Sequence, residues 1–212
     1  MNNVCITGVG LVSSLGHTPD KLFGNLKKNK CFFQEETSWK ELIGLNTHVS
    51  SPAQNYEVSD LPRQVRRSMS PMSKMGYLAA HNALKDAGLT VNRNVNSNSD
   101  LYKTDSLKTL LMMGSTTGSP IFLEEYFTKM IKNGGPAGQL STSFLKIMNH
   151  SVSANVALAL GYSGPSISPS SACSTSAQAA IIAMQFIRAG IYDVAIVGGA
   201  DECLVQVCSI FN

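Results

Sequence analysis

The chain alternates between short apolar runs and longer stretches in which apolar residues recur at helical spacing. Apolar runs at residues 4–9, 107–113 and 193–197 predict buried strands. The helical pattern predicts helices near residues 19–28, 72–87, 120–132 and 174–189, and a further helical region that starts at Ser141 or Ser143 and ends before Gly161. Strands that alternate with helices predict an α/β domain with a mainly parallel central sheet and helices on both faces.

Polar residues and prolines mark where the predicted helices begin. Thr18 precedes Pro19, Ser70 precedes Pro71, and Ser119 precedes a third proline. Hydroxyl side chains cap exposed N–H groups and proline fits the first helical turn, so each serine or threonine is expected to be an N-cap.

Composition excludes several classes of protein. The chain has 212 residues, of which 43% are hydrophobic and 15% charged, so it can bury a sizeable core. A net charge of +3 without a dense basic run does not support nucleic-acid binding. No apolar run reaches the roughly 18 residues that a membrane span needs, and no signal peptide is recognisable, so we expect a cytoplasmic protein with no membrane partner.

The five cysteines, at positions 5, 31, 173, 203 and 208, lack the spacing of a disulfide framework or a metal site, so no metal is expected. The glycine-rich turns also depart from nucleotide-binding motifs. Ser13 stands where a dinucleotide fingerprint needs its third glycine, and no lysine follows Gly118.

Cys173 is the strongest candidate for chemistry. It ends a strand-like segment and opens a helix whose apolar stripe is expected to be buried, namely Ala177, Ala180, Ile181, Met184 and Ile187. The helix N-terminus would favour the thiolate form of Cys173, and neighbouring N–H groups could bind an oxyanion. From this local pattern alone, a small buried cysteine without a chemical role remains an alternative.

A second feature is the basic group Arg63, Arg66, Arg67 and Lys74, near the predicted start of the helix at 72–87. Positive charge at the positive end of a helix is unfavourable, which suggests an anionic partner. A solvated basic turn is the alternative.

Several segments together resemble the β-ketoacyl-[acyl carrier protein] synthase family. The sequence around Cys173 reads GPSISPSSACSTSA (164–177) and is followed by AGIYDVAIVGGAD (189–201). The opening VCITGVGLVSSLG (4–16) and the NGGP segment (133–136) ahead of Met148-Asn149 are similar to the same enzymes and fall in the same order. The resemblance implies that residues 1–212 form the N-terminal half of a thiolase-like fold, with the C-terminal half absent.

The resemblance also implies an activity in fatty acid or polyketide synthesis. Cys173 would receive an acyl group from the phosphopantetheine of acyl carrier protein, with no bound cofactor, and the acyl group would then condense with decarboxylated malonyl-carrier protein. Two histidines and a lysine come from the C-terminal half in the family, and none of the histidines here, at positions 17, 48, 81 and 150, matches them. The chain alone is therefore expected not to complete the condensation.

Further roles are carried over from the family. Phe144 and Met148 are expected near the acyl pocket, and Arg63, Arg66 and Arg67 at the docking site for the carrier protein. The family implies a homodimer or heterodimer. Two departures are Pro169, inside the strand that lies at the dimer interface, and Ala137-Gly138, which replace basic residues after NGGP.

Two other functions remain as alternatives. One is a non-catalytic truncated partner subunit of a thiolase-like assembly, held by apolar surface. The other is a degradative thiolase or related coenzyme A enzyme, which the ACSTSA segment and the basic turn disfavour.

Overall fold

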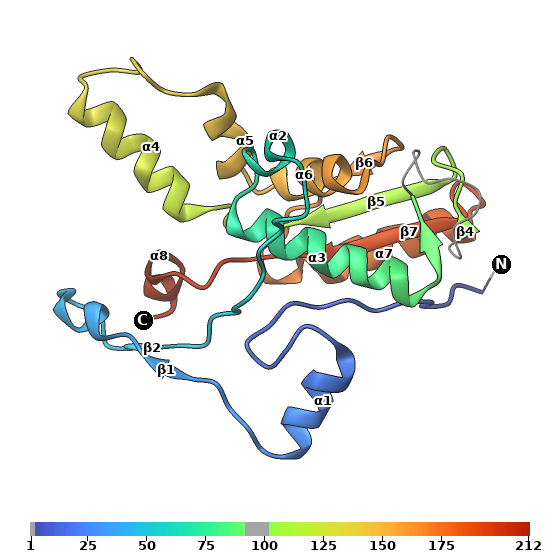
Figure 1. Cartoon of the computed structure of the whole chain (residues 1–212), viewed down its shortest axis with the longest axis horizontal. Coiled ribbons are helices and arrows are strands. Elements are labelled where there is room, and N and C mark those ends of the chain that lie inside the picture. Colours follow the sequence, from blue (N-terminus) through green and yellow to red (C-terminus); the bar gives the residue numbers. More distant parts are fainter. Residues whose placement is uncertain (1–2, 92–101) are drawn as a thin grey trace.

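A parallel three-stranded sheet forms the centre of the protein (Figure 1). The computed structural model describes residues 3–91 and 102–212. The strand order is β6 (Ser166–Ile167), β5 (Thr109–Gly114) and β7 (Val194–Gly199), with Leu111 opposite Ser166 and Thr109 opposite Val194. Every residue of β5 is buried, as expected for an apolar central strand covered on both faces.

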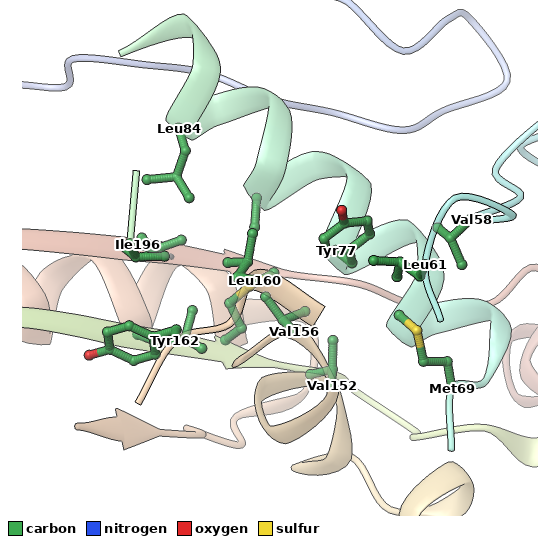
Figure 2. Packing of buried hydrophobic residues seen from close by; sticks show 14 of the residues in the cluster. Val58, Leu61, Met69, Tyr77, Leu84, Val152, Val156, Leu160, Tyr162 and Ile196 are labelled. Atoms are coloured by element: carbon green, nitrogen blue, oxygen red, sulfur yellow. The ribbon is translucent and has the colours of Figure 1, made fainter. Parts of the chain in front are cut away.

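Helices cover both faces of this sheet, as predicted. Leu111 and Met113 of β5 pack with α3 (Pro71–Asp86) and α6 (Ser151–Leu160) in one apolar cluster. Figure 2 shows part of this cluster, and both helices contact the sheet directly on this face, α3 at β7 and α6 at β5. The alternate residues Leu110 and Met112 face α7 (Thr175–Arg188) on the other side.

The other elements are short or lie around this core. The helices are α1 (Pro19–Lys27), α2 (Arg63–Arg66), α4 (Pro120–Lys132), α5 (Phe144–Ile147) and α8 (Val205–Cys208). Single 3₁₀ turns span Thr37–Glu41, Ser141–Ser143, Ala172–Ser174 and Ser209–Phe211. β1 (Gln34–Glu35) pairs antiparallel with β2 (Val49–Ser50), and β3 (Leu89–Thr90) pairs parallel with β4 (Tyr102–Lys103). No helix among residues 3–91 and 102–212 is long and apolar enough to cross a bilayer.

Of the three predicted N-caps, the structure confirms one and contradicts two. The Thr18 hydroxyl accepts the Lys21 N–H at 3.3 Å, which confirms the cap of α1. Ser70 and Ser119 stand at the N-cap positions of α3 and α4, but neither hydroxyl caps its helix. A distant carboxylate oxygen, Glu202 Oε1, instead accepts the Met72 N–H of α3 at 3.1 Å.

The helical region predicted from Ser141 or Ser143 to Leu160 is interrupted. Met148, with φ −74° and ψ 143°, is extended and separates α5 from α6. Gly161, with φ +64°, ends α6 as predicted. Most of the predicted apolar stripe is core, since Ile147, Val152, Val156 and Leu160 are buried.

The prediction of a buried strand at residues 4–9 is wrong. This segment runs beside α3 without pairing with any strand of the described chain, and Ile6 is 89% exposed (Figure 1). Its glycines instead allow close contact with the helix, because a Cβ on Gly8 would lie 2.2 Å from the Ala83 carbonyl oxygen. The Val9 N–H donates to Asp86 Oδ2 at 2.9 Å. An apolar run forms a strand only when a neighbouring strand lies within hydrogen-bonding reach.

The helix after Cys173 is confirmed, but the prediction of its buried stripe is wrong. The buried residues of α7 are Thr175, Ala179 and Ala183, which face the sheet. Ile181, in the predicted stripe, is 57% exposed. Because α7 is apolar on several sides, composition alone does not reveal which face meets the sheet, and small residues allow the closer approach.

Pro169 lies outside the sheet, contrary to the prediction. β6 ends at Ile167, so the missing N–H of Pro169 removes no bond from the ladder. The Pro169 carbonyl oxygen lies against the end of β5, 2.4 Å from where a Cβ on Gly114 would stand.

Candidate functional site

The carboxyl ends of the three parallel strands meet at one edge of the sheet. After β5 the chain continues through Ser115 and Thr116, after β7 through Ala200 and Asp201, and after β6 through the segment that leads to Cys173. Polar loops gather at this edge in parallel α/β sheets, which makes it the expected location of a site.

Cys173 occupies the middle of the 3₁₀ turn Ala172–Ser174, and its side chain is exposed. The turn leads directly into α7, which begins at Thr175 and spans 14 residues. Cys173 therefore lies at the end of α7 that carries the positive partial charge of the helix, as predicted.

The backbone before Cys173 adopts an unusual conformation. Ala172 has φ +49°, in the left-handed region that residues with a Cβ rarely adopt. The Thr175 hydroxyl accepts the Ser171 N–H at 3.0 Å and donates to the Ala172 carbonyl oxygen at 2.8 Å. The turn is therefore held from inside by the first residue of α7.

Asp201 joins the ends of β5 and β7. Its Oδ1 accepts the Ser115 hydroxyl and the Thr116 N–H, both at 2.7 Å, and its Oδ2 lies 3.1 Å from Thr116 Oγ1. Thr116 Oγ1 is also 3.3 Å from the Ala172 carbonyl oxygen, so this network reaches the peptide next to Cys173. Thr116 and Asp201 were not among the residues predicted for the site, although polar residues directly after buried strands are a signal that the sequence contains.

Glu202 follows Asp201 and is nearly inaccessible, at 5% exposed. Burial raises the pKa of Glu202, while the nearby Ser119 hydroxyl and the hydrogen bond from the Met72 N–H oppose the shift in part. The neighbouring charge of Asp201 raises the pKa of Glu202 further. The carboxyl group of Glu202 therefore links the segment after β7 to the N-terminus of α3.

Phe144 and Met148, the predicted pocket residues, lie on and just after α5. Phe144 is 53% exposed and its ring lies 6.3 Å from that of His150. Asn149 Nδ2 donates to Ser170 Oγ at 2.8 Å, so the loop after α5 contacts the segment before Cys173. The structure brings this loop to the same edge, but no hydrogen bond or aromatic contact in the described chain joins either predicted side chain to Cys173.

The three predicted docking arginines lie on or next to α2 and are exposed. Arg66 Nε donates to the Leu61 carbonyl oxygen at 2.9 Å, which fixes one of the three. Lys74, the fourth residue of the predicted basic group, forms an ion pair with Glu57 at 2.8 Å. The three arginines form no ion pair within the described chain and remain available to an anionic partner.

One surface cleft of the described chain lies apart from Cys173, which is not among its lining residues. It has a volume of about 690 Å³ and lies along α4, with Gln206 of α8 on its other side. Its lining residues are Ile121, Glu124, Glu125, Thr128, Lys129, Lys132, Asn133 and Gln206. Cleft size thus does not identify the site, whereas the strand ends and α7 do.

Exposure does not single out Cys173 among the cysteines, because Cys5, Cys31 and Cys203 are exposed as well. Cys208 is half-buried, and its burial, together with the neighbouring Cys203 as a smaller cause, raises the pKa of its thiol. What distinguishes Cys173 is its place before a long helix and after a strained residue.

Comparison with known proteins gives a consistent result. The family described as "Beta-ketoacyl synthase, N-terminal domain" matches residues 1–209. The 3-oxoacyl-[acyl-carrier-protein] synthase 1 of Haemophilus influenzae is 30% identical over 215 residues, which cover 100% of this chain and 50% of the relative. Nodulation protein E of Rhizobium meliloti is 26% identical, over 96% of this chain and 48% of the relative. The chain thus spans about half the length of these curated relatives.

Solved structures agree with this result. A β-ketoacyl synthase from Burkholderia phymatum superposes with a TM-score of 0.85 at 27% identity, over 100% of this chain and 50% of that one. The ishigamide ketosynthase/chain length factor superposes at 0.77, with 19% identity, over 97% of this chain and 49% of that one, which is a likeness of fold. The predicted α/β fold of the thiolase-like class is confirmed by these superpositions.

Proposed function

The chain belongs to the β-ketoacyl synthase family, whose N-terminal domain it matches, and we propose that it carries the acyl-accepting thiol of a β-ketoacyl-[acyl carrier protein] synthase in fatty acid or polyketide synthesis. The observation that carries this proposal is the position of Cys173, exposed at the carboxyl edge of the parallel sheet and directly before α7. A cysteine in such a place can act as a nucleophile.

The proposed reaction has two steps. The Cys173 thiolate attacks the acyl thioester of the phosphopantetheine arm, and the new carbon–sulfur bond forms as the arm leaves as a thiol after taking up a proton. Malonyl-carrier protein then loses CO₂, and its carbanion attacks the Cys173 thioester to release β-ketoacyl-carrier protein and the free thiolate. No further cofactor takes part.

The two steps make different demands on the protein. Acyl transfer needs the thiolate and donors for the oxyanion, which the turn and the N-terminus of α7 can offer. Decarboxylation needs further groups that stabilise a developing carbanion or enolate. In the described chain His17 pairs with the Gln54 carbonyl, His81 with Tyr77 and His150 with Phe144, and none of the three is hydrogen-bonded to Cys173. We therefore propose that the 212-residue chain by itself accepts an acyl group but does not complete the condensation.

The test is acyl loading followed by mass spectrometry of the peptide that contains residue 173. Incubation with acyl-carrier protein should label Cys173, and Cys173→Ser should abolish the label. Cys203→Ser is the matched control, because Cys203 is also exposed but precedes only the four-residue helix α8. A label that persists in Cys173→Ser, or that depends on Cys203, contradicts the proposal.

Exposed apolar surface favours a second candidate, a non-catalytic partner subunit of a thiolase-like assembly. Ile6 and Ile181, on the N-terminal segment and on α7, are both largely exposed, as is Val9 in part. Such surface is typical of an interface, and a homodimer or heterodimer fits either candidate. The two candidates differ in one result, because a non-catalytic partner would leave Cys173 unlabelled.

The docking arginines give the proposed carrier partner a specific test. A neighbour of similar fold is a ketosynthase in complex with a type II polyketide acyl-carrier protein, at 19% identity. Carrier proteins that offer anionic groups would meet Arg63 and Arg67, which are exposed beside α2. We expect Arg63→Glu/Arg67→Glu to weaken carrier binding roughly tenfold at low salt and to flatten its salt dependence. Lys27→Glu/Lys28→Glu on and next to α1 is the control of equal charge change, and equal effects of both pairs would reject the docking assignment.

Phe144 and Met148 are proposed to line the acyl pocket. The supporting observation is the hydrogen bond from Asn149 to Ser170, which holds the loop after α5 against the segment before Cys173. Met148→Trp should then slow loading of a long acyl chain more than loading of an acetyl group. An equal effect on both substrates would argue against a pocket role.

A further inference from the structure

The conformation of Ala172 is held against its own preference. Its φ of +49° places a residue with a Cβ in the left-handed region, directly before Cys173. Such a conformation costs free energy and persists only when surrounding contacts enforce it. The contacts that enforce it therefore also set the direction of the next residue.

Thr175 makes the contacts that bracket this conformation. Its hydroxyl accepts the Ser171 N–H at 3.0 Å on one side and donates to the Ala172 carbonyl oxygen at 2.8 Å on the other. A hydroxyl can fill both roles at once, because it has one donor hydrogen and two acceptor lone pairs. The two bonds close the turn around Ser171 and Ala172.

The sheet fixes the direction of the Thr175 side chain. Thr175 is 4% exposed, and its Cγ2 lies 2.5 Å from where a Cβ on Gly114 would stand. The methyl group therefore occupies the space that Gly114 leaves open at the end of β5. Because a β-branched residue has few rotamers, a fixed methyl group also fixes the hydroxyl.

The neighbouring hydroxyl of Thr116 does not replace that of Thr175. Thr116 Oγ1 lies 3.1 Å from Asp201 Oδ2 and 3.3 Å from the Ala172 carbonyl oxygen, but it has one hydrogen to donate. The carboxylate is the stronger acceptor and the closer one, so that hydrogen goes to Asp201. The Thr175 hydroxyl therefore remains the side-chain donor to the Ala172 carbonyl, which also accepts the backbone N–H of Thr175.

We propose that Thr175 is the positioning residue for Cys173: its hydroxyl holds Ala172 in the left-handed conformation and so aims the thiol of Cys173 out of the turn. Thr175 does not touch the substrate in this account. The inference rests on the proposed function, because the direction of the thiol matters for acyl transfer only if Cys173 accepts the acyl group.

The first test compares three variants in the rate of acyl loading on Cys173. Thr175→Val keeps the shape and removes the hydroxyl, and it should slow loading at least about tenfold, since small errors of alignment are costly in transfer reactions. Thr175→Ser keeps the hydroxyl and should restore most of the rate. Thr117→Val is the control, because the buried Thr117 hydroxyl has no hydrogen-bond partner in the described chain. Equal rates for the valine and serine variants overturn the proposal.

A second measurement separates alignment from reactivity. Iodoacetamide is small and can reach an exposed thiol from many directions, so Thr175→Val should change alkylation of Cys173 far less than acyl loading. Parallel losses in both rates, together with a lower melting temperature, mean that Thr175 has only a structural role and overturn the proposal.

A crystal structure of Thr175→Val tests the inference without any activity. Ala172 should leave the left-handed region, and a φ that stays near +49° overturns the proposal even if the wild type loads acyl groups. Conversely, if the wild type fails to load, the proposed function is rejected while this structure still decides the role of Thr175.

The last variant addresses folding. Glycine adopts positive φ without a steric penalty, so Ala172→Gly should recover part of the loading rate that Thr175→Val loses. If Thr175→Val folds only when Ala172→Gly is added, the proposed role of Thr175 is supported. Failure of the single and the double variant alike to fold overturns the proposal.

Discussion

The buried carboxyl group of Glu202 should make the free energy of unfolding fall as the pH rises, whereas a salt-bridged surface glutamate makes it rise. Glu202 is 5% exposed, its Oε1 accepts the Met72 N–H at 3.1 Å, and its Oε2 has no hydrogen-bond partner in the described chain. Burial raises the pKa of Glu202 above 4.5. The folded state therefore binds this proton more tightly than the unfolded state does.

The sign of the effect follows from that difference. The stability gained from the raised pKa is fully present below the ordinary glutamate pKa and is lost as the pH rises through the folded-state pKa of Glu202. Glu202→Gln keeps an acceptor for the Met72 N–H but does not titrate. The wild type should thus lose unfolding free energy relative to Glu202→Gln as the pH rises above the ordinary glutamate pKa, by at most about 1.4 kcal/mol per pH unit.

Removal of the whole carboxyl group of Glu202 should also lower the free energy of unfolding. Glu202→Ala leaves the Met72 N–H buried and unpaired at the start of α3, where Ser70 provides no side-chain bond. An orphaned buried donor costs about 1–3 kcal/mol, a large share of the 5–15 kcal/mol that is usual for a domain.

The assay is urea unfolding of the wild type, Glu202→Gln and Glu202→Ala at several pH values. Glu35→Gln serves as the opposite control, because the hydrogen bond to Lys40, and then the charge of Lys40, lower the pKa of Glu35. The wild type should gain slightly relative to that variant as the pH rises. Parallel curves for the wild type and Glu202→Gln, or a gain by the wild type, would refute the reasoning.

Three further changes test core packing and helix capping. Gly76→Ala should lower the free energy of unfolding in urea by about 1 kcal/mol, because the added Cβ lies 2.9 Å from Val152 Cγ2 and this crowding outweighs the gain in helix propensity. Val152→Ala in the same chain should relieve part of the crowding, and strictly additive effects of the two changes would contradict this explanation. Tyr162→Phe should cost about 1 kcal/mol, because the hydroxyl lies 2.5 Å from the Thr109 carbonyl oxygen and 3.0 Å from that of Pro165. Burial raises the pKa of Tyr162 to about 12, so spectrophotometric titration of the wild type should show one tyrosine that ionises at this high pH, and Tyr162→Phe should lack it. An unchanged titration curve in the variant would argue against this assignment. Thr18→Ala should lower helicity and stability by about 0.5–1 kcal/mol through loss of the α1 cap, whereas Thr18→Ser should not.

The local pattern of the sequence was sufficient for the elements that build the site. The apolar run of β5 and the helical patterns of α3, α4 and α7 were predicted close to their observed bounds, because burial and helical periodicity act over a few residues. The same holds for Cys173, whose place before α7 follows from a strand-like segment, a turn and a long apolar helix in direct succession.

Contacts between distant residues decided the rest. Residues 4–9 have the composition of a strand but lie against α3, where Gly8 approaches Ala83, so burial of that run depended on a neighbour that the pattern cannot contain. The cap of α3 comes from Glu202, 130 positions beyond the Met72 N–H that it binds. A serine at the N-cap position is a local signal, and a carboxyl group brought there by the sheet replaced it.

The sequence by itself therefore determined β5, α3, α4 and α7 and which thiol precedes a long helix. The tertiary structure decided which face of α7 meets the sheet, how Asp201 links Thr116 to the turn, and how Thr175 holds Ala172. The physical reason is range: propensity and periodicity are properties of a few successive residues, whereas the aim of a side chain depends on groups that only the packed sheet brings within hydrogen-bonding distance.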